Sequence, residues 1–339
     1  MEKQTYTFSG AKVDYYFDGS IKQLKEIVDP KAAVIITDEN VFKAHHAAFK
    51  NWNTIALKAG EQYKVQATVD AIVEQLIALG VDRKFTLVGV GGGVITDITG
   101  YIASIYMRGI RCGFVPTTLL AMVDASIGGK NGIDVGIYKN MVGIIRQPSF
   151  LLYDFKLLSS LPEAEWQNGF AEIIKHAAIK DGALFKELQQ YNIGYYQKNK
   201  KALAALVKRN ALIKTKVVLK DEFEKGDRRL LNFGHTLGHA IENQYELSHG
   251  QAVAIGMTYA AELSERILNY KGKNELIELI KAYQLPTYAK FSMKKAIAVL
   301  EKDKKKEKAV MNYILLQKNG KGVVYPIPMS DLTNLLLQL

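Results

Sequence analysis

The chain has 339 residues, of which 48% are hydrophobic and 23% are charged, and its 45 Lys and Arg against 34 Asp and Glu give a formal net charge of +11. This composition excludes a disordered or fibrous chain. The single cysteine, Cys112, excludes an internal disulfide framework and a cysteine-based zinc site within one chain. With no signal-peptide core and no run of about 18 apolar residues, the sequence predicts a soluble, cytoplasmic protein of two domains.

Short β-branched runs alternate with helical patterns in the first half of the chain, as expected for βα units on a parallel sheet. This part is predicted to form a Rossmann-like α/β domain over residues 1–157. Predicted strands cover residues 32–37, 85–90 and 111–115, and predicted helices begin near residue 41, cover 68–79 and begin again near 94.

Helical periods dominate the second half, which predicts a mainly α-helical domain over residues 158–339. A tight junction near residues 155–162, with a ligand cleft beside it, is expected between the two domains. Predicted helices cover residues 163–180, 200–220, 235–245, 251–268 and 274–283, and short strands are predicted at 312–316 and 323–325.

The positive charge is unevenly spread along the chain. Between Lys294 and Lys308, seven lysines stand against three acidic residues. The sequence shows no arginine-rich stripe interleaved with aromatic residues, as a nucleic-acid-binding surface has. We therefore interpret this segment as a solvated helix end and loop, with one lysine reaching an anionic small molecule as the alternative.

Three consecutive glycines, Gly91-Gly92-Gly93, stand between a predicted strand and a predicted helix. There the backbone N–H groups and the helix dipole favour a phosphate or pyrophosphate. The run differs from the G-x-G-x-x-G fingerprint, since Val94 and Thr96 occupy the positions of its third glycine. Asp97 is predicted on the first helical turn, where the dipole favours an acid. A flexible turn is the alternative interpretation of the three glycines.

Polar residues gather in an otherwise apolar context after the third predicted strand. Asp124 and Lys130 are followed by the pair Lys139-Asn140. Lysine ammonium groups and an amide beside a glycine loop suit a substrate that carries phosphate or carboxylate.

Histidines mark a candidate metal site in the second half. Glu172 precedes His176 by four residues on one helical face, and His235 and His239 have the same spacing, with His249 nearby. Two imidazoles and a carboxylate from different helices would form a three-ligand site with an open position, as in catalytic zinc sites. Spacing alone leaves these five candidates for three positions.

Six motifs resemble those of the 3-dehydroquinate synthase family: GVGGGVITDITGYIAS, VPTTLLAMVDASIGGK, KNMVG, GFAEIIKHAAI, RRLLNFGHTLGHAIE and SHGQAVAIGM. The resemblance runs in order from about residue 38 to residue 306. The resemblance implies a dehydroquinate synthase-like fold and a metal- and NAD-dependent lyase of the shikimate pathway, the route to chorismate and the aromatic amino acids. The family converts 3-deoxy-D-arabino-heptulosonate 7-phosphate into 3-dehydroquinate and phosphate. The steps are transient oxidation by NAD, phosphate elimination, re-reduction, ring opening and intramolecular aldol closure.

The resemblance also implies roles for individual residues. It assigns a zinc ion, or cobalt with the same ligands, to Glu172, His235 and His249. It assigns NAD to Asp38, Asn40, Glu61, Lys64, Gly92, Gly93, Asp97, Thr117, Thr118, Asp124, Lys130, Lys139 and Ser160. Catalytic and substrate contacts fall on Arg108, Asp124, Lys130, Lys139, Asn140, Lys175, Lys214, Arg228, Asn232, His239 and one of Lys304 and Lys305.

The family's counterpart of Arg108 reaches a phosphate in the neighbouring subunit of a homodimer, so a homodimer is expected. Two other enzymes remain as alternatives: another sugar phosphate cyclase, of inosose or valiolone type, and a glycerol-dehydrogenase-like oxidoreductase. Cations suited to a carboxylated substrate disfavour the first, and the number of phosphate-directed cations disfavours the second. A basic nucleic-acid-binding protein would give Glu172, His235 and His249 no role.

Overall fold

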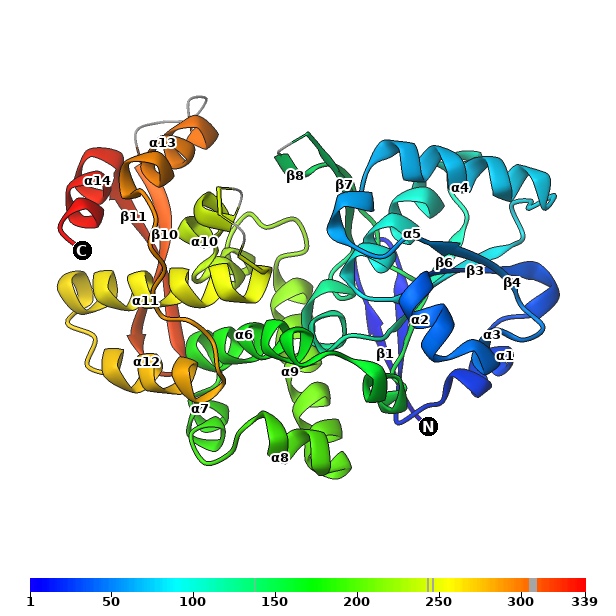
Figure 1. The fold of residues 1–339 in the computed structure, drawn as a ribbon, viewed down its shortest axis with the longest axis horizontal. Coiled ribbons are helices and arrows are strands. Elements are labelled where there is room, and N and C mark those ends of the chain that lie inside the picture. The colour runs from blue at the N-terminus through cyan, green and yellow to red at the C-terminus, as the bar shows by residue number, and fades with distance from the viewer. Residues whose placement is uncertain (137, 243, 246, 305–309) are drawn as a thin grey trace. The chain divides into compact units, whose positions relative to one another are not determined.

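The computed structural model describes residues 1–136, 138–242, 244–245, 247–304 and 310–339 (Figure 1). By their contacts, these residues form two compact units, Met1–Glu165 with Lys200–Glu222 and Trp166–Asn199 with Phe223–Leu339. The helix α9 (Lys200–Lys220) thus belongs to the first unit, although it lies beyond residue 157 in the chain. The functional domain boundary at residues 157/158 stays a prediction.

A seven-stranded sheet forms the centre of the described part of the first unit, in the order β1-β2-β9-β6-β5-β3-β4. All neighbouring strands are parallel except β1 and β2. The strands predicted at 32–37, 85–90 and 111–115 are confirmed to within one residue. The bounds are β1 (Glu2–Thr7), β2 (Lys12–Phe17), β3 (Ala33–Asp38), β4 (Asn53–Leu57), β5 (Thr86–Gly91), β6 (Arg111–Pro116) and β9 (Phe150–Leu152).

Buried apolar runs explain the central strands of this sheet. Val34, Ile35 and Ile36 in β3 are fully buried on successive positions, as expected for a parallel strand covered on both faces. The helices of the unit are α1 (Leu24–Ile27), α2 (Glu39–Ala44), α3 (His46–Phe49), α4 (Gln66–Ala78), α5 (Gly93–Ile105) and α9. The sheet is thereby held in a Rossmann-like α/β arrangement.

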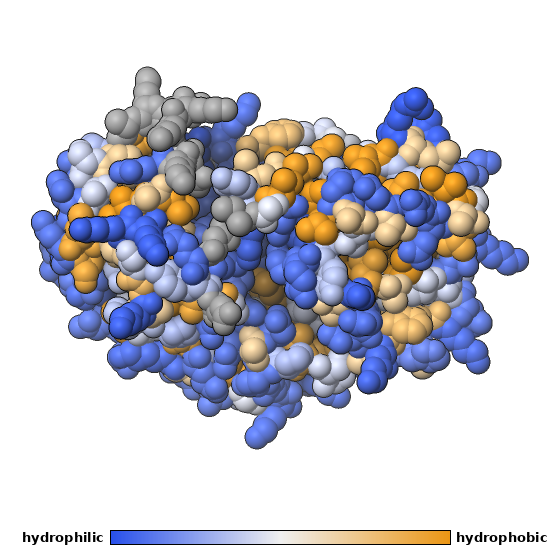
Figure 2. Space-filling model, turned by 45° about the horizontal axis from the view of Figure 1, so that its top comes forward, coloured by the Kyte–Doolittle hydropathy of each residue, from blue (hydrophilic) through white to orange (hydrophobic). Residues whose placement is uncertain are grey.

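A separate antiparallel pair, β7 (Lys130–Val135) and β8 (Tyr138–Ile145), also belongs to the first unit. It exposes large apolar side chains: Val135, Tyr138, Met141, Val142 and Ile144 are 39–69% exposed. Figure 2 shows one face of the molecule, on which hydrophobic and hydrophilic residues are interspersed. Exposed apolar groups of this extent in one hairpin are typical of interaction surfaces.

The described part of the second unit is mainly helical, as predicted, with one antiparallel pair of strands. The prediction for 163–180 matches α6 residue for residue, and 200–220 matches α9. The bounds are α6 (Glu163–Lys180), α7 (Gly182–Leu188), α8 (Ile193–Lys198), α10 (His235–Glu242), α11 (His249–Leu268), α12 (Lys273–Ala282), α13 (Met293–Lys304), β10 (Val310–Lys318), β11 (Lys321–Pro328) and α14 (Met329–Leu337).

Among the described residues, every helix is too short or too polar to cross a lipid bilayer.

Cys112 gives a test of the first unit's core. The residue lies in β6 and is 2% exposed, and burial raises the pKa of its thiol to about 11. Because the thiolate is the reactive form, alkylation by iodoacetamide at pH 8 should be more than about 100-fold slower in the folded protein than in urea. Mass spectrometry measures the labelling, with Cys112→Ala as the control for non-specific reaction. Equal labelling rates would contradict the placement of β6.

Candidate functional site

Close backbone contact between α10 and α11 sets the positions of three histidines in the second unit. A Cβ on Gly256 would lie 1.8 Å from the carbonyl oxygen of Gly234, and Gly234 itself has a left-handed φ of +79°. Glycine is therefore required at both positions. His235 begins α10 directly after Gly234, while His249 begins α11 after its N-cap Ser248, whose hydroxyl accepts the N–H of Gln251.

The carboxylate of Glu172, from α6, lies between two of these imidazoles. Its Oε1 is 3.3 Å from Nε2 of His235 and 3.2 Å from Nε2 of His249, and Glu172 is fully buried. One donor atom from each of the three residues lies within 4.8 Å of the other two. The Nδ1 of His235 is 3.1 Å from the carbonyl oxygen of Phe233, which fits Nδ1–H donation and leaves Nε2 as a ligand. The structure brings together the three residues named as zinc ligands.

The surroundings of this group favour the charged forms of Glu172 and His249. Burial would raise the pKa of Glu172, but the ammonium of Lys175, which pairs with its Oε2, and the imidazole of His235 hold that pKa well below its usual range. Burial likewise opposes protonation of His249, yet hydrogen bonds to Glu172 and Glu242 raise its pKa to about 10. The buried carboxylate thus attracts cations from several directions.

Sequence reasoning missed one acidic member of this neighbourhood. Glu242 Oε2 lies 3.6 Å from Nδ1 of His249, and His239, Glu242 and His249 form a second group of close donor atoms. The i, i+3 spacing of His239 and Glu242 on one helix was an available signal. His176, the fifth candidate, is fully buried on α6 and lies outside the group of Glu172, His235 and His249.

The glycine loop lies at the carboxyl ends of the parallel strands in the first unit. Gly91 ends β5, and Gly92 is the N-cap of α5. The chain passes from β3 to its outer neighbour β4 and then to β5 on the other side of β3, so β3 and β5 flank a topological switch point. Ligands of open α/β sheets bind at this point. Asp38 ends β3 at the same edge and caps α2 through its Oδ1, which accepts the N–H groups of Asn40 and Val41.

The loop after β6 packs against the glycines. Thr117 donates its N–H to the carbonyl of Gly91. A Cβ on Gly92 would lie 3.0 Å from the Cγ2 of Thr118. The π-helical segment Ala121–Ala125 follows and contains Asp124. The ammonium of Lys214, from α9, lies 2.8 Å from both the backbone oxygen and Oδ2 of Asp124.

A buried ammonium joins three further predicted residues. Lys64 is 4% exposed, and its Nζ lies 2.6 Å from Oδ2 of Asp97 and 2.6 Å from Oδ1 of Asn140. Glu61 Oε1 is 4.0 Å from the same nitrogen. The prediction of Asp97 on the first turn of the helix is wrong: it is the fifth residue of α5, and its carboxylate pairs with Lys64 instead of with the helix N-terminus.

The remaining predicted residues are placed individually. Arg108 is exposed with a φ of +64°, and the hydroxyl of Ser160 lies 2.9 Å from Nε2 of His45. Arg228 is buried, and Asn232 donates its amide N–H to Glu224 Oε1 at 2.7 Å. Asn40, Lys130 and Lys139 lie on α2, β7 and β8. Lys305 lies outside the described residues, and the side chain of Lys304 is not described either.

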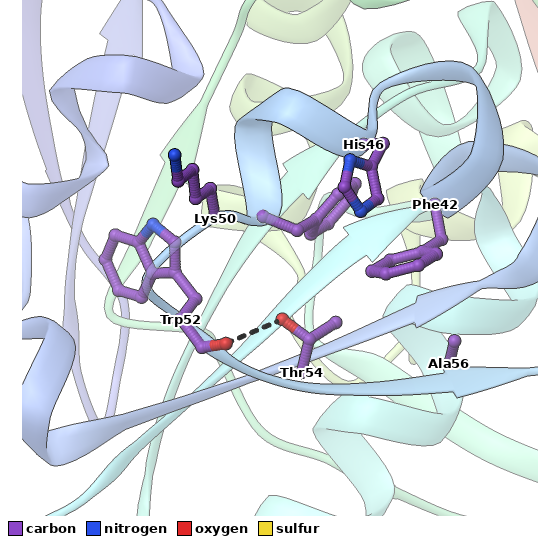
Figure 3. Close-up of a pocket in the computed structure, with 7 residues that line it drawn as sticks. Phe42, His46, Lys50, Trp52, Thr54 and Ala56 are labelled. Atoms are coloured by element: carbon purple, nitrogen blue, oxygen red, sulfur yellow. Dashed lines mark hydrogen bonds between the residues drawn. The ribbon is translucent and has the colours of Figure 1, made fainter.

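A separate pocket of about 290 Å³ lies beside the edge strand β4 (Figure 3). In Figure 3, Trp52 lies on one side of Thr54, and Phe42 and His46 lie on the other. The other residues that line the pocket are Phe49, Lys50 and Ala56. The predicted site residues do not line this pocket, so it has no role in the assignments above.

Comparison with known proteins places these features in a family context. The family model described as 3-dehydroquinate synthase N-terminal matches residues 54–168, and the model described as 3-dehydroquinate synthase C-terminal matches residues 169–306. A 3-dehydroquinate synthase of Halalkalibacterium halodurans is 37% identical over 308 residues, which cover 87% of this chain and 85% of that protein.

Two solved structures share the fold over nearly the whole chain. A 2-deoxy-scyllo-inosose synthase in complex with carbaglucose-6-phosphate, NAD+ and Co²⁺ is 25% identical, with a TM-score of 0.86 and coverage of 99% of this chain and 100% of that one. The 2-epi-5-epi-valiolone synthase of Streptomyces hygroscopicus subsp. jinggangensis, with NAD+ and Zn²⁺ bound, is 24% identical, with a TM-score of 0.87 and coverage of 100% and 99%.

The glycine contact between α10 and α11 can be tested by Gly256→Ala. The added methyl group would overlap the carbonyl of Gly234, so α10 must shift and carry His235 away from Glu172. We expect a loss of about 1–3 kcal/mol in the free energy of unfolding, measured by urea titration, and weaker binding of Co²⁺, measured by calorimetry. Gly10→Ala, where a Cβ meets no atom within 4 Å, is the control. Unchanged stability and Co²⁺ binding in Gly256→Ala would refute the argument.

Proposed function

Because the chain belongs to the 3-dehydroquinate synthase family, we propose that it converts 3-deoxy-D-arabino-heptulosonate 7-phosphate into 3-dehydroquinate and phosphate. The observation that carries this proposal is the convergence of Glu172, His235 and His249 on one point in a chain that the family's models match on both sides of residue 168. The reaction is an internal redox lyase reaction in which the hydride removed at the start is returned, so NAD is not consumed.

The donor set of Glu172, His235 and His249 fits a divalent metal. Two imidazole nitrogens and one carboxylate oxygen form the three-ligand set of catalytic zinc, with a position left for substrate. We assign zinc to this set, with cobalt accepted by the same ligands, and the 25% identical inosose synthase was crystallised with Co²⁺. When bound, the metal supplies Lewis-acid chemistry that lowers the pKa of a coordinated substrate hydroxyl.

The carboxyl edge of the sheet in the first unit is the proposed site of NAD, which supplies hydride transfer when bound. Gly92 and Gly93 present the N-terminal N–H groups of α5, which suit a pyrophosphate. Asp38, at the end of β3, is assigned to the adenosine side. Lys64 and Asp97 form a fixed charged pair on the same unit. The other assigned residues are Asn40, Glu61, Thr117, Thr118, Asp124, Lys130, Lys139 and Ser160.

The substrate carries a phosphate and a carboxylate, and both units contain cations that can offset this charge. In the first unit, Lys214 is held by Asp124 through two contacts of 2.8 Å, which fixes the direction of its ammonium group. In the second unit, buried Lys175 and Arg228 are assigned to the same task. The other proposed substrate contacts are Arg108, Lys130, Lys139, Asn140 and Asn232.

Proton movements in the second unit are assigned to polar groups beside the metal ligands. The ring of His239 lies 5.1 Å from that of His235 and 6.2 Å from that of His249, measured between centroids. It can therefore accept or return a proton while the three ligands stay in place. Asn232 is oriented by its bond to Glu224 and positions the substrate. Elimination of the phosphate requires alignment of the substrate's own phosphate oxygen more than it requires a strong base from the protein.

We also propose a homodimer in which Arg108 reaches the active site of the other subunit. The exposed apolar residues of the β7–β8 pair support an interaction surface on the first unit. Arg108 belongs to the same unit and is exposed, and its left-handed backbone points to a constrained position.

The metal assignment predicts the behaviour of Glu172→Gln. Loss of the carboxylate charge should reduce bound zinc, measured by elemental analysis, and lower kcat/KM for phosphate release by at least about 100-fold. Glu165→Gln, on the same helix but outside the group, is the matched control. A chelator should abolish turnover in the wild type, and zinc should restore it. Full zinc content with full turnover in Glu172→Gln would show that the metal is held elsewhere.

The choice of substrate is tested in the same assay. The heptulosonate phosphate should release phosphate without net NADH formation, whereas glucose 6-phosphate and sedoheptulose 7-phosphate, which lack the carboxylate, should not react. Reaction of either sugar phosphate in preference would support an inosose or valiolone cyclase.

The dimer assignment predicts complementation between two inactive variants. Arg108→Ala and Glu172→Gln should each be impaired alone, but mixing equal amounts under exchange conditions should restore about a quarter of wild-type activity, because hybrid dimers contain one complete site. Each variant mixed with itself is the control, and light scattering reports the dimer. Absence of recovery in mixtures that demonstrably exchange subunits would place Arg108 outside the partner's site.

A further inference from the structure

The strand β7 contains an irregular position at Asp134. The pairing of β7 with β8 shifts register between Ile133 and Val135, and Asp134 forms an isolated parallel bridge with Val65 instead. Its backbone N–H donates to the carbonyl oxygen of Lys64 at 2.7 Å. Bulges of this kind redirect side chains and are frequent beside active sites. The irregularity therefore joins the hairpin to the loop that carries Lys64.

The side chain of Asp134 continues this connection. Its Oδ1 accepts the backbone N–H of Asn140 at 2.7 Å, and Asn140 adopts a left-handed φ of +56°. The amide oxygen of Asn140 then accepts from Nζ of Lys64 at 2.6 Å. Three hydrogen bonds thus form a closed ring: Lys64 carbonyl to Asp134, Asp134 carboxylate to Asn140, and Asn140 amide to the Lys64 ammonium.

The ring fixes a buried charge. Lys64 is 4% exposed and pairs with Asp97 at 2.6 Å, while Glu61 lies 4.0 Å from its ammonium. Burial would lower the pKa of Lys64, but Asp97, Glu61 and Asp134 together raise it. Burial, with a smaller contribution from the charge of Asp134, raises the pKa of Asp97, although the ammonium groups of Lys64 and Lys214 oppose this rise. The hydrogen bonds determine where the Lys64 ammonium points.

We propose that Asp134 is a positioning residue, which holds Asn140 in its left-handed conformation and thereby orients Asn140 and Lys64 toward the cofactor and substrate. This inference rests on the proposed function, which assigns Lys64 to NAD and Asn140 to substrate. Asp134 itself touches neither in this role. It acts by removing the conformational freedom that Asn140, an exposed residue of β8, otherwise has.

Two substitutions separate the hydrogen bond from the charge. Asp134→Ala removes the acceptor for the Asn140 N–H, and we expect NAD to bind about 10-fold more weakly and KM for the heptulosonate phosphate to rise by a similar factor, with kcat changed less. Asp134→Asn keeps an acceptor oxygen and should recover most of the loss. Calorimetry on the zinc-loaded protein measures NAD binding, and phosphate release gives kcat and KM. Asp82→Ala, which removes a comparable carboxylate bond to the Lys84 N–H, is the matched control.

A double substitution tests whether Asp134 acts through Asn140. Glycine adopts a left-handed φ without strain, so Asn140→Gly alone and Asn140→Gly with Asp134→Ala should bind NAD equally. Additive losses would overturn the inference, as would wild-type NAD binding and KM in Asp134→Ala. Asp134→Asn as impaired as Asp134→Ala would also overturn it. If the wild type itself neither binds NAD nor releases phosphate, the proposed function fails instead. Should Asp134→Ala not fold, NAD binding is compared between Asp134→Asn and Asn140→Gly. Stronger binding in Asp134→Asn than in Asn140→Gly supports the inference, and equally weak binding in both overturns it.

Discussion

The second unit depends on one buried negative charge. A carboxylate that loses its water is strongly destabilised unless cations or hydrogen bonds replace that solvation, and Glu172 is fully buried. Its surroundings meet this requirement with an ammonium from its own helix and imidazoles from two others. The same requirement makes the position a natural site for a divalent cation, because a metal ion brings two positive charges to the buried carboxylate.

The first unit contains the opposite arrangement. A buried ammonium, Lys64, lies among the carboxylates of Asp97, Glu61 and Asp134, and it is shared among them. Each unit therefore fixes a charged centre by burial and pairing. For a reaction that moves hydride and eliminates phosphate, such fixed charges stabilise charge development without rearrangement during the reaction.

The sequence allowed prediction of features that depend on local periodicity or on recognisable motifs. The central strands and the helices α6 and α9 have strong apolar patterns, and their limits agree closely with prediction. The sheet strands β1, β2, β4 and β9 and the pair β7–β8 were missed. These strands lack the continuous buried apolar run of the central strands, or are only three residues long, as β9 is. That α9 packs with the first unit has no local signal at all, since helical periodicity does not specify a partner.

The same distinction applies to the site. The spacing of the five candidates Glu172, His176, His235, His239 and His249 indicated a metal group, but the choice among them required tertiary geometry or family resemblance. Asp97 was misplaced because α5 begins at Gly93, which makes Asp97 its fifth residue, and the lysine that pairs with its carboxylate comes from a distant loop.

Backbone irregularity adds a further link between fold and function. Asp124 lies in a π-helical segment, Asp134 at a register shift, and Arg108 and Asn140 have left-handed φ angles. A left-handed residue can also have a purely local cause, as at Asn269, which ends α11. Of the four positions named here, Arg108, Asp124 and Asn140 are assigned to substrate, and Asp134 holds one of these three. Regular strands and helices supply the rigid frame, and irregular backbone positions direct individual polar groups. Functional sites are the places where a sequence is expected to depart from its local structural preferences.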